Sequence, residues 1–112
     1  MLPPQHRLRR SEDFRSVVRT GKRAGGRYVV AHVLTKSTRP TRVGFVVSKA
    51  VGNAATRNRV KRRMRHICAE VLEERSQPAD IVVRALPRSS TATFTQLRTE
   101  MRRNLGKLGV LE

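Results

Sequence analysis

The chain has 112 residues, and its 25 Lys and Arg against 8 Asp and Glu give a formal net charge of +17. Such a length forms one domain, and because hydrophobic residues make up 38% and Trp is absent, its modest core must rest on aliphatic side chains. This charge produces strong self-repulsion and attracts phosphate-rich partners, with nucleic acid first and an anionic membrane surface as the weaker alternative.

The compartment and the membrane can be judged from three features. No apolar run reaches the roughly 18 residues that a spanning helix needs. The N-terminal stretch MLPPQHRLRR lacks the apolar region of a signal peptide. A single cysteine, Cys68, cannot form an internal disulfide and suits a reducing compartment. We therefore expect a cytoplasmic protein with no membrane partner.

Periodicity and turn residues predict the elements in chain order. Residues 1–10 are basic and aperiodic, so we expect a flexible arm there, followed by a single domain over residues 11–112. A segment at 22–27 is flexible or an edge strand. The other elements are a two-turn helix from an N-cap at Ser11 to Gly21, strands over 28–34 and 43–48, a helix from about Ala54 to Arg75, a strand over 81–86, and a helix that starts at a Thr93 to Gln96 capping box and ends near Gly106 to Gly109.

Two expectations concern how these strands lie. The strands at 28–34 and 43–48 follow one another across a short turn, KSTRPTR, which favours an antiparallel hairpin. The strand at 81–86 lacks strict alternation, so we expect it to be buried on both faces of the sheet.

The helix from about Ala54 to Arg75 concentrates positive charge near its start. Most of the nine residues from Arg57 to Arg65 are Lys or Arg, and no acidic residue interrupts them before Glu70. Like charges three or four residues apart on a helix repel by roughly a few tenths of a kcal/mol per pair. An ordinary solvated helix face would intersperse acids, so we infer that a polyanion offsets this repulsion.

These charges fall on two faces of the helix. Its apolar stripe consists of Val60, Met64, Ile67 and Val71. At about 100° per residue, an outward basic group should face solvent; it consists of Arg59, Arg62, Arg63 and His66. An inward basic group should point toward the sheet edge; it consists of Arg57, Lys61 and Arg65. The outward group suits the backbone of a large folded nucleic acid, and the inward group suits a strand held between helix and sheet.

Other polar residues support less specific interpretations. Ser48, Gly52 and Asn53 fit turn chemistry and a phosphate-contacting loop before a helix equally well. His32 lies among apolar strand residues and fits the core or the wall of a cleft. His6 and His66 have no Cys or carboxylate at metal-ligand spacing, so we expect no zinc site in the protein.

The stretch GFVVSKAVGNAATRNRVKRRMRH, over residues 44–66, resembles the signature of the bacterial ribonuclease P protein subunit. That pattern has a strand, Ser-Lys, a Gly-Asn turn and a helix beginning with Arg-Asn-Arg, which here is Arg57, Asn58 and Arg59. The resemblance implies an α/β (α+β) two-layer sandwich with a small mixed sheet, in which the basic helix joins two parallel neighbouring strands by a left-handed crossover.

The resemblance also implies the activity. The RNA subunit of ribonuclease P cuts precursor tRNA with Mg²⁺, which is bound mainly by that RNA and the substrate. The protein, one monomer per RNA, binds the catalytic RNA and the 5′ leader of precursor tRNA. The leader cleft implied here consists of Phe14, Val18, His32, Arg57, Asn58, Lys61 and Arg65. Contacts with the catalytic RNA or with phosphates are implied for Ser48, Lys49, Asn53, Arg59, Arg62 and Arg63. Relatives often carry an aromatic residue at position 18 and can carry Tyr at 32, so Val18 and His32 predict poorer base stacking.

Three alternatives belong to other classes. A ribosomal or other structural RNA-binding protein fits the charge equally well and is separated only by the signature. A protein nuclease needs a carboxylate cluster for metals or a His base with a partner, and the eight acids show no such cluster. A helix-turn-helix DNA reader is disfavoured because the basic helix is long and follows strands.

Overall fold

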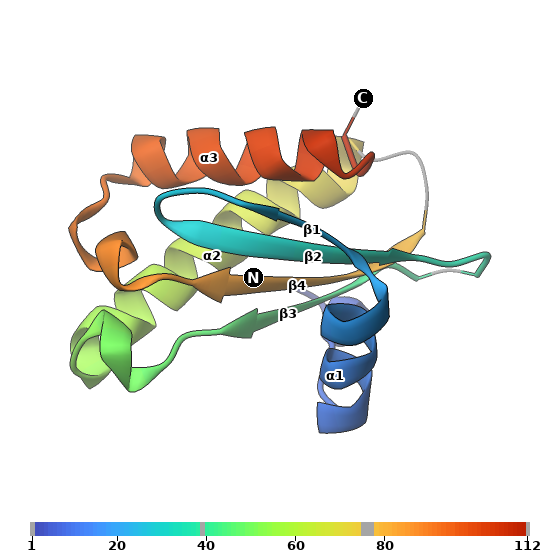
Figure 1. Cartoon of the computed structure of the whole chain (residues 1–112), viewed down its shortest axis with the longest axis horizontal. Coiled ribbons are helices and arrows are strands. Elements are labelled where there is room, and N and C mark those ends of the chain that lie inside the picture. Colours follow the sequence, from blue (N-terminus) through green and yellow to red (C-terminus); the bar gives the residue numbers. More distant parts are fainter. Residues whose placement is uncertain (1, 39, 75–77, 112) are drawn as a thin grey trace.

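The computed structural model describes residues 2–38, 40–74 and 78–111. Within these residues the chain forms a four-stranded sheet and three α-helices (Figure 1). In chain order they are α1 Ser11–Thr20, β1 Lys22–Gly25, β2 Val29–Thr35, β3 Arg42–Val46, α2 Ala54–Glu74, β4 Ala79–Ala85 and α3 Phe94–Lys107. Short 3-10 helices occupy η1 Pro4–His6, η2 Lys49–Val51 and η3 Pro87–Thr91.

The sheet has the strand order β1-β2-β4-β3. β2 pairs antiparallel with β1 and with β4, whereas β3 pairs parallel with β4. The expected antiparallel hairpin of β2 and β3 is therefore wrong, because β4 lies between these two strands. Burial explains why β4 lies between β2 and β3. Every residue of β4 except Arg84 is buried, so this strand suits a central position with both of its faces covered, as expected.

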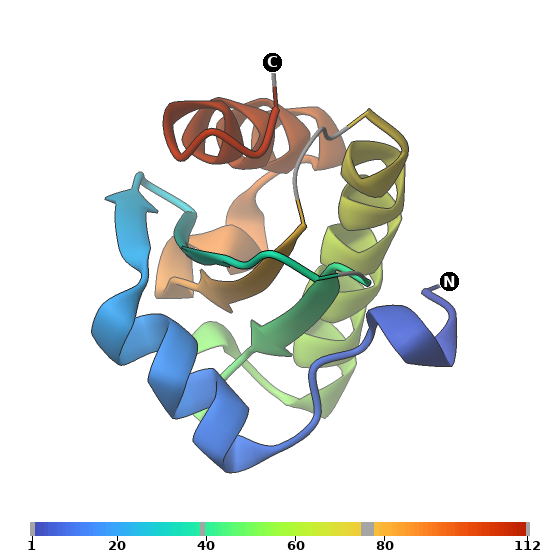
Figure 2. The ribbon, with the colours of Figure 1, turned by 90° about the vertical axis from the view of Figure 1, so that its right-hand side faces the viewer.

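The connection from β3 through α2 to β4 has the implied left-handed crossover. In Figure 1 both strands point to the left, β4 lies above β3, and α2 returns behind the sheet; Figure 2 confirms that α2 lies on that face. This is an exception to the usual right-handed rule for parallel strands. It brings the basic half of α2 beside β3, which is one of the two edge strands of the sheet.

Two hydrophobic clusters lie on opposite faces of the sheet. The larger cluster packs α2 and α3 against the sheet through side chains such as Met64, Ile67 and Met101. The smaller one lies under α1 and contains Leu8, Val17 and Val82, with Phe14 packed against it. The helices α2 and α3 therefore cover one face, while α1 covers only part of the other.

Local boundaries agree with the sequence patterns to within one or two residues, with one difference at a cap. The capping box of α3 is confirmed, since the Thr93 side chain accepts from the Gln96 N–H and the Gln96 side chain accepts from the Thr93 N–H. Ser11 is the first residue of α1 rather than its N-cap; the N-cap position is Arg10, whose side chain makes no capping bond. The segment at 22–27 contains the edge strand β1. Arg75, the expected end of α2, lies outside the described residues.

The N-terminal residues differ from the expected flexible arm. Leu2 and Leu8 are buried, and η1 lies between them. Figure 2 shows this segment starting beside α2 and passing β3 to reach α1. Leu2 and Leu8 explain the difference. Each places its apolar side chain in a core cluster, and this burial holds the N-terminal segment on the domain.

Candidate nucleic-acid interface

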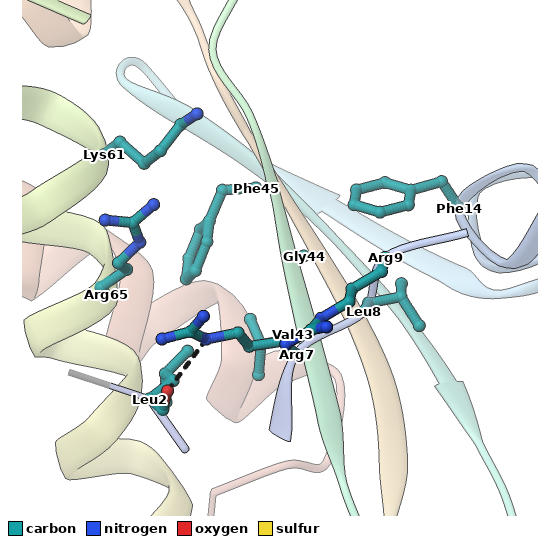
Figure 3. A pocket seen from close by; sticks show the side chains of 10 residues that line it. All are labelled: Leu2, Arg7, Leu8, Arg9, Phe14, Val43, Gly44, Phe45, Lys61 and Arg65. Carbon is teal, nitrogen blue, oxygen red and sulfur yellow. Dashed lines mark hydrogen bonds between the residues drawn. The ribbon is translucent and has the colours of Figure 1, made fainter. Parts of the chain in front are cut away.

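A basic hollow of about 500 Å³ opens at the edge of β3, between α2, α1 and the N-terminal segment. We call it the β3-edge pocket, and Figure 3 shows the residues that line it. They are Leu2, Arg7, Leu8, Arg9, Phe14, Val43, Gly44, Phe45, Lys61 and Arg65. Four of them are cationic and none is acidic. An anionic ligand would thus meet positive charge without a competing carboxylate among the lining residues.

Two members of the inward basic group lie in this pocket. Lys61 and Arg65, one turn apart on α2, extend toward Phe45 from the helix side (Figure 3). Arg57 is half-buried one turn earlier on α2, and Asn58 is exposed, but neither lines the pocket. The structure therefore places Lys61 and Arg65 at the sheet edge as the helical wheel predicted, and it brings Phe14 to the same pocket.

The far end of the Phe14 ring comes close to the β3 backbone because the strand has a glycine at that point. A Cβ added at Gly44 would overlap the far end of the Phe14 ring. The missing side chain thus lets the aromatic ring approach the strand backbone closely. The ring forms the α1 side of the pocket, opposite α2 (Figure 3).

An ion-pair network fixes α1, and hence Phe14, relative to the sheet. Arg42 in β3 forms two hydrogen bonds to Asp80 in β4, at 3.0 and 2.7 Å, and its Nη1 lies 3.4 Å from Asp13 of α1. Lys36 Nζ also lies 3.0 Å from Asp80. Burial raises the pKa of the Asp80 carboxyl, but the hydrogen bonds from Arg42 and Lys36 outweigh burial and hold that pKa below its usual value.

Val18 and His32 do not join the β3-edge pocket. Val18 is 44% exposed on α1 and lines a separate shallow apolar hollow with Phe14 and Val46, flanked by Arg15 and Arg19.

His32 is 3% exposed, so its ring belongs to the buried layer rather than to an open cleft wall. It lies opposite Arg23 of β1, and neither ring nitrogen has a hydrogen-bond partner among the described residues. Burial lowers the pKa of His32, and the positive charges of Arg84 and Arg23 lower it further. The ring is therefore neutral at physiological pH and offers a binding site little direct access.

The outward basic group is less exposed than expected. Arg59 donates to the Ser90 carbonyl at 2.8 Å and Arg63 to the Ala92 carbonyl at 3.0 Å, and both are half-buried. The prediction that they face open solvent is wrong, because η3 and the connection from η3 to α3 run along this flank of α2. Arg62 is exposed, and His66 contacts Phe94 edge to face at 5.5 Å. Each guanidinium has five N–H donors, so Arg59 and Arg63 still have donors for phosphate.

The loop before α2 combines capping with exposed polar groups. The Asn53 side chain accepts from the Thr56 N–H at 2.9 Å, so it caps α2, which favours the turn-chemistry interpretation for this residue. Ser48 and Lys49 are exposed beside it, and the Ser48 side chain makes no capping bond. Gly52 has φ +155°, a value that other residues rarely adopt.

Sequence reasoning missed Arg7, Arg9 and Phe45 as pocket residues. The only sequence signal for the two arginines was weak. It consisted of Leu2 and Leu8, the apolar residues that anchor the segment carrying them. It also missed Glu100, a carboxylate on the buried side of α3 that accepts from three backbone N–H groups of the β1–β2 turn. A lone Glu within the apolar stripe of a helix was the only available signal.

The described residues form neither a metal-binding cluster nor a membrane-spanning helix. Over residues 2–38, 40–74 and 78–111, no group of three or more His, Cys, Asp and Glu side chains is placed to hold a metal ion. In the same part of the chain, no helix combines the length and apolar character needed to cross a membrane.

A mixed sheet with a basic helix along its edge, and a hollow that joins cations to aromatic rings, define an RNA-binding protein. The chain matches the Ribonuclease P family over residues 2–109. It is 53% identical to the ribonuclease P protein component of Kocuria rhizophila, over 91% of this chain and 90% of the relative, and 49% identical to that of Acidothermus cellulolyticus, over 96% and 92%.

Solved structures agree with the sequence comparisons. The RNase P protein of Staphylococcus aureus aligns with a TM-score of 0.85 at 26% identity, covering 96% of this chain and 98% of that one. The protein from Thermotoga maritima, solved with 1-(4-fluorophenyl)-2-thiourea, aligns with a TM-score of 0.80 at 28% identity, covering 95% and 100%.

The chain therefore belongs to the ribonuclease P protein family, as the signature implied. It is a component of the tRNA-processing ribonucleoprotein and partners the ribonuclease P RNA.

Proposed function

We propose that the β3-edge pocket binds the 5′ leader of precursor tRNA while the RNA subunit supplies the catalytic groups. The observation that carries this proposal is the convergence of Lys61 and Arg65 with Phe14 and Phe45 in one hollow without an acidic lining residue. Cations that follow a backbone, with aromatic rings that stack on bases, are the two ingredients of single-strand binding.

The other parts of the proposal concern assembly. One protein chain binds one catalytic RNA, and the flank of α2 with Arg59, Arg62 and Arg63 contacts its phosphates. Mg²⁺ is held mainly by the RNA subunit and the substrate, and the holoenzyme works in the cytoplasm. A steep fall of affinity with salt should accompany these contacts, by roughly 0.7 in log affinity per log salt for each single-strand phosphate.

The test compares two tRNAs, because mature tRNA has no leader. In reconstituted holoenzyme, Lys61→Ala with Arg65→Ala should weaken binding of precursor tRNA and leave mature tRNA nearly unchanged. Each lost contact should cost on the order of 1 kcal/mol, the size of a charge-assisted hydrogen bond partly screened by solvent. Equilibrium titrations at fixed salt and saturating protein measure both affinities.

Matched controls separate the two faces of α2 from a general loss of charge. Arg27→Ala with Lys107→Ala removes the same charge at exposed positions outside the pocket and should change neither affinity. Arg59→Ala with Arg62→Ala should weaken assembly with the catalytic RNA and so affect both tRNAs alike. If the Lys61 and Arg65 changes lower the affinity for mature tRNA as much as for precursor, the assignment of the leader to this pocket is wrong.

A further inference from the structure

The N-terminal residues 2–9, which we call the N-terminal strap, cross the edge of the sheet from one face to the other. Leu2 belongs to the larger core cluster on the α2 face, and Leu8 belongs to the smaller cluster on the α1 face. Between them, His6 Nδ1 donates to the Thr41 carbonyl at 2.7 Å, and the Leu8 N–H donates to the Val43 carbonyl at 2.9 Å. The strap is thus anchored on both sides of β3.

This anchoring turns two arginines toward the β3-edge pocket. Arg7 and Arg9 flank Leu8 and line the same pocket as Lys61 and Arg65, with the Arg7 side chain extending toward α2 (Figure 3). Arg7 Nε donates to the Leu2 carbonyl at 3.0 Å, which holds its guanidinium in place. Arg10, by contrast, pairs with Glu12 at 3.6 Å and is not a lining residue. The strap therefore supplies half of the cations in the pocket.

The strap also leaves the next part of the β3 edge facing the pocket. The Val43 carbonyl points outward, since it accepts from Leu8 rather than from β4. Residues two apart in a strand turn their peptide groups to the same side, so the N–H and C=O of Phe45 also point to the edge. The pocket thus combines two aromatic rings, outward peptide groups and cations from α2 and from the strap, which suits one or two nucleotides of a single strand.

We propose that the N-terminal strap is an RNA-binding element, in which Arg7 and Arg9 contact phosphates of the same precursor-tRNA leader that Lys61 and Arg65 contact. This inference rests on the proposed function of the pocket. The leader then lies between two basic walls, one from α2 and one from the strap, along the edge of β3. Leu2 and Leu8 act as positioning residues, because their buried side chains hold the second wall in place.

The first experiment measures tRNA affinity with the reconstituted holoenzyme. The double variant Arg7→Gln with Arg9→Gln should bind precursor tRNA more weakly. The affinity should fall by about fivefold for each lost contact, which corresponds to a partly screened charge-assisted hydrogen bond. Mature tRNA should bind as before, and the salt dependence for precursor should become shallower by roughly 0.7 per contact. Arg10→Gln, one position beyond the strap, is the matched control and should change neither affinity.

The outcomes separate this inference from the proposed function. If the Arg7 and Arg9 changes leave precursor binding unaltered while the Lys61 and Arg65 changes weaken it, the strap inference is overturned and the pocket assignment stands. If the strap variant weakens both tRNAs equally, the inference is also overturned, because the leader is not what the strap contacts. If the Lys61 and Arg65 changes have no effect, the proposed function itself fails.

A second measurement does not depend on a loss of affinity. Cys68 is buried, so a photo-crosslinker can be attached selectively to the thiol of an Arg9→Cys variant. In the holoenzyme this probe should crosslink to the leader of precursor tRNA, whereas the same probe on a Lys107→Cys variant should not. Absence of leader crosslinks from position 9 would overturn the inference even if the double variant folds poorly.

Discussion

Glu100 should contribute strongly to the stability of the folded protein, although it lies outside the β3-edge pocket. The residue is 4% exposed, and its side chain accepts from the backbone N–H groups of Arg27 at 2.7 Å, Tyr28 at 2.6 Å and Val29 at 2.7 Å. A carboxylate of α3 thus holds the turn between β1 and β2. Replacing it with Ala would leave three donors without their acceptor.

The size of the effect follows from the burial of these donors. An unsatisfied buried polar group costs about 1–3 kcal/mol. Val29 is fully buried and should bear most of that cost, whereas exposed Arg27 and half-buried Tyr28 can recruit water. We expect Glu100→Ala to lower the free energy of unfolding by about 2–4 kcal/mol, of which about 1–3 kcal/mol belongs to the Val29 N–H. This is a large part of the roughly 5–15 kcal/mol typical of a domain.

Urea unfolding followed by far-UV circular dichroism measures this change, since the chain has no Trp to report by fluorescence. Glu73→Ala, at an exposed position of α2, removes the same charge and should change the unfolding free energy little. Glu100→Gln should fall between the two, because its amide keeps one acceptor oxygen but turns an NH₂ toward backbone donors. A loss for Glu100→Ala under about 1 kcal/mol, or equal to that of Glu73→Ala, would refute the reasoning.

Three other predictions each concern one residue. Gly44→Ala should displace the Phe14 ring that it would overlap, so precursor-tRNA affinity and the unfolding free energy should both fall in parallel titrations and melts. Burial raises the pKa of Cys68 to about 12, so a thiol reagent at about pH 8 should modify it only after unfolding; rapid labelling of the native protein would contradict this. Because the pKa of His32 is lowered in the folded state, the unfolded chain takes up its proton first, and stability should fall as pH drops below about 6.5. In thermal melts, the His32→Leu variant should lose less stability than the unchanged protein as the pH drops below about 6.5. An equal loss in both proteins would show that other groups cause it.

The candidate site was predictable where its signals are local. The spacing of apolar residues placed Lys61 and Arg65 on the sheet side of a helix, and the structure confirms that position. The same wheel was wrong for Arg59 and Arg63, because it cannot show that a distant segment, η3 with its connection to α3, runs along their flank. A helix sequence specifies which side chains share a face, but not what covers that face.

The sequence by itself determined the helices, the capping box of α3, the charge that requires a polyanion and the signature of the family, because each depends on neighbouring residues or on composition. Only the tertiary structure decided that β4 lies between β2 and β3, that His32 is buried, and that residues 2–9 cross the sheet edge. The physical reason is that strand order and strap docking depend on contacts between segments far apart in the chain. Which strand is covered on both faces, and where two isolated leucines find apolar surface, are set by the free energy of the assembled core rather than by any local pattern.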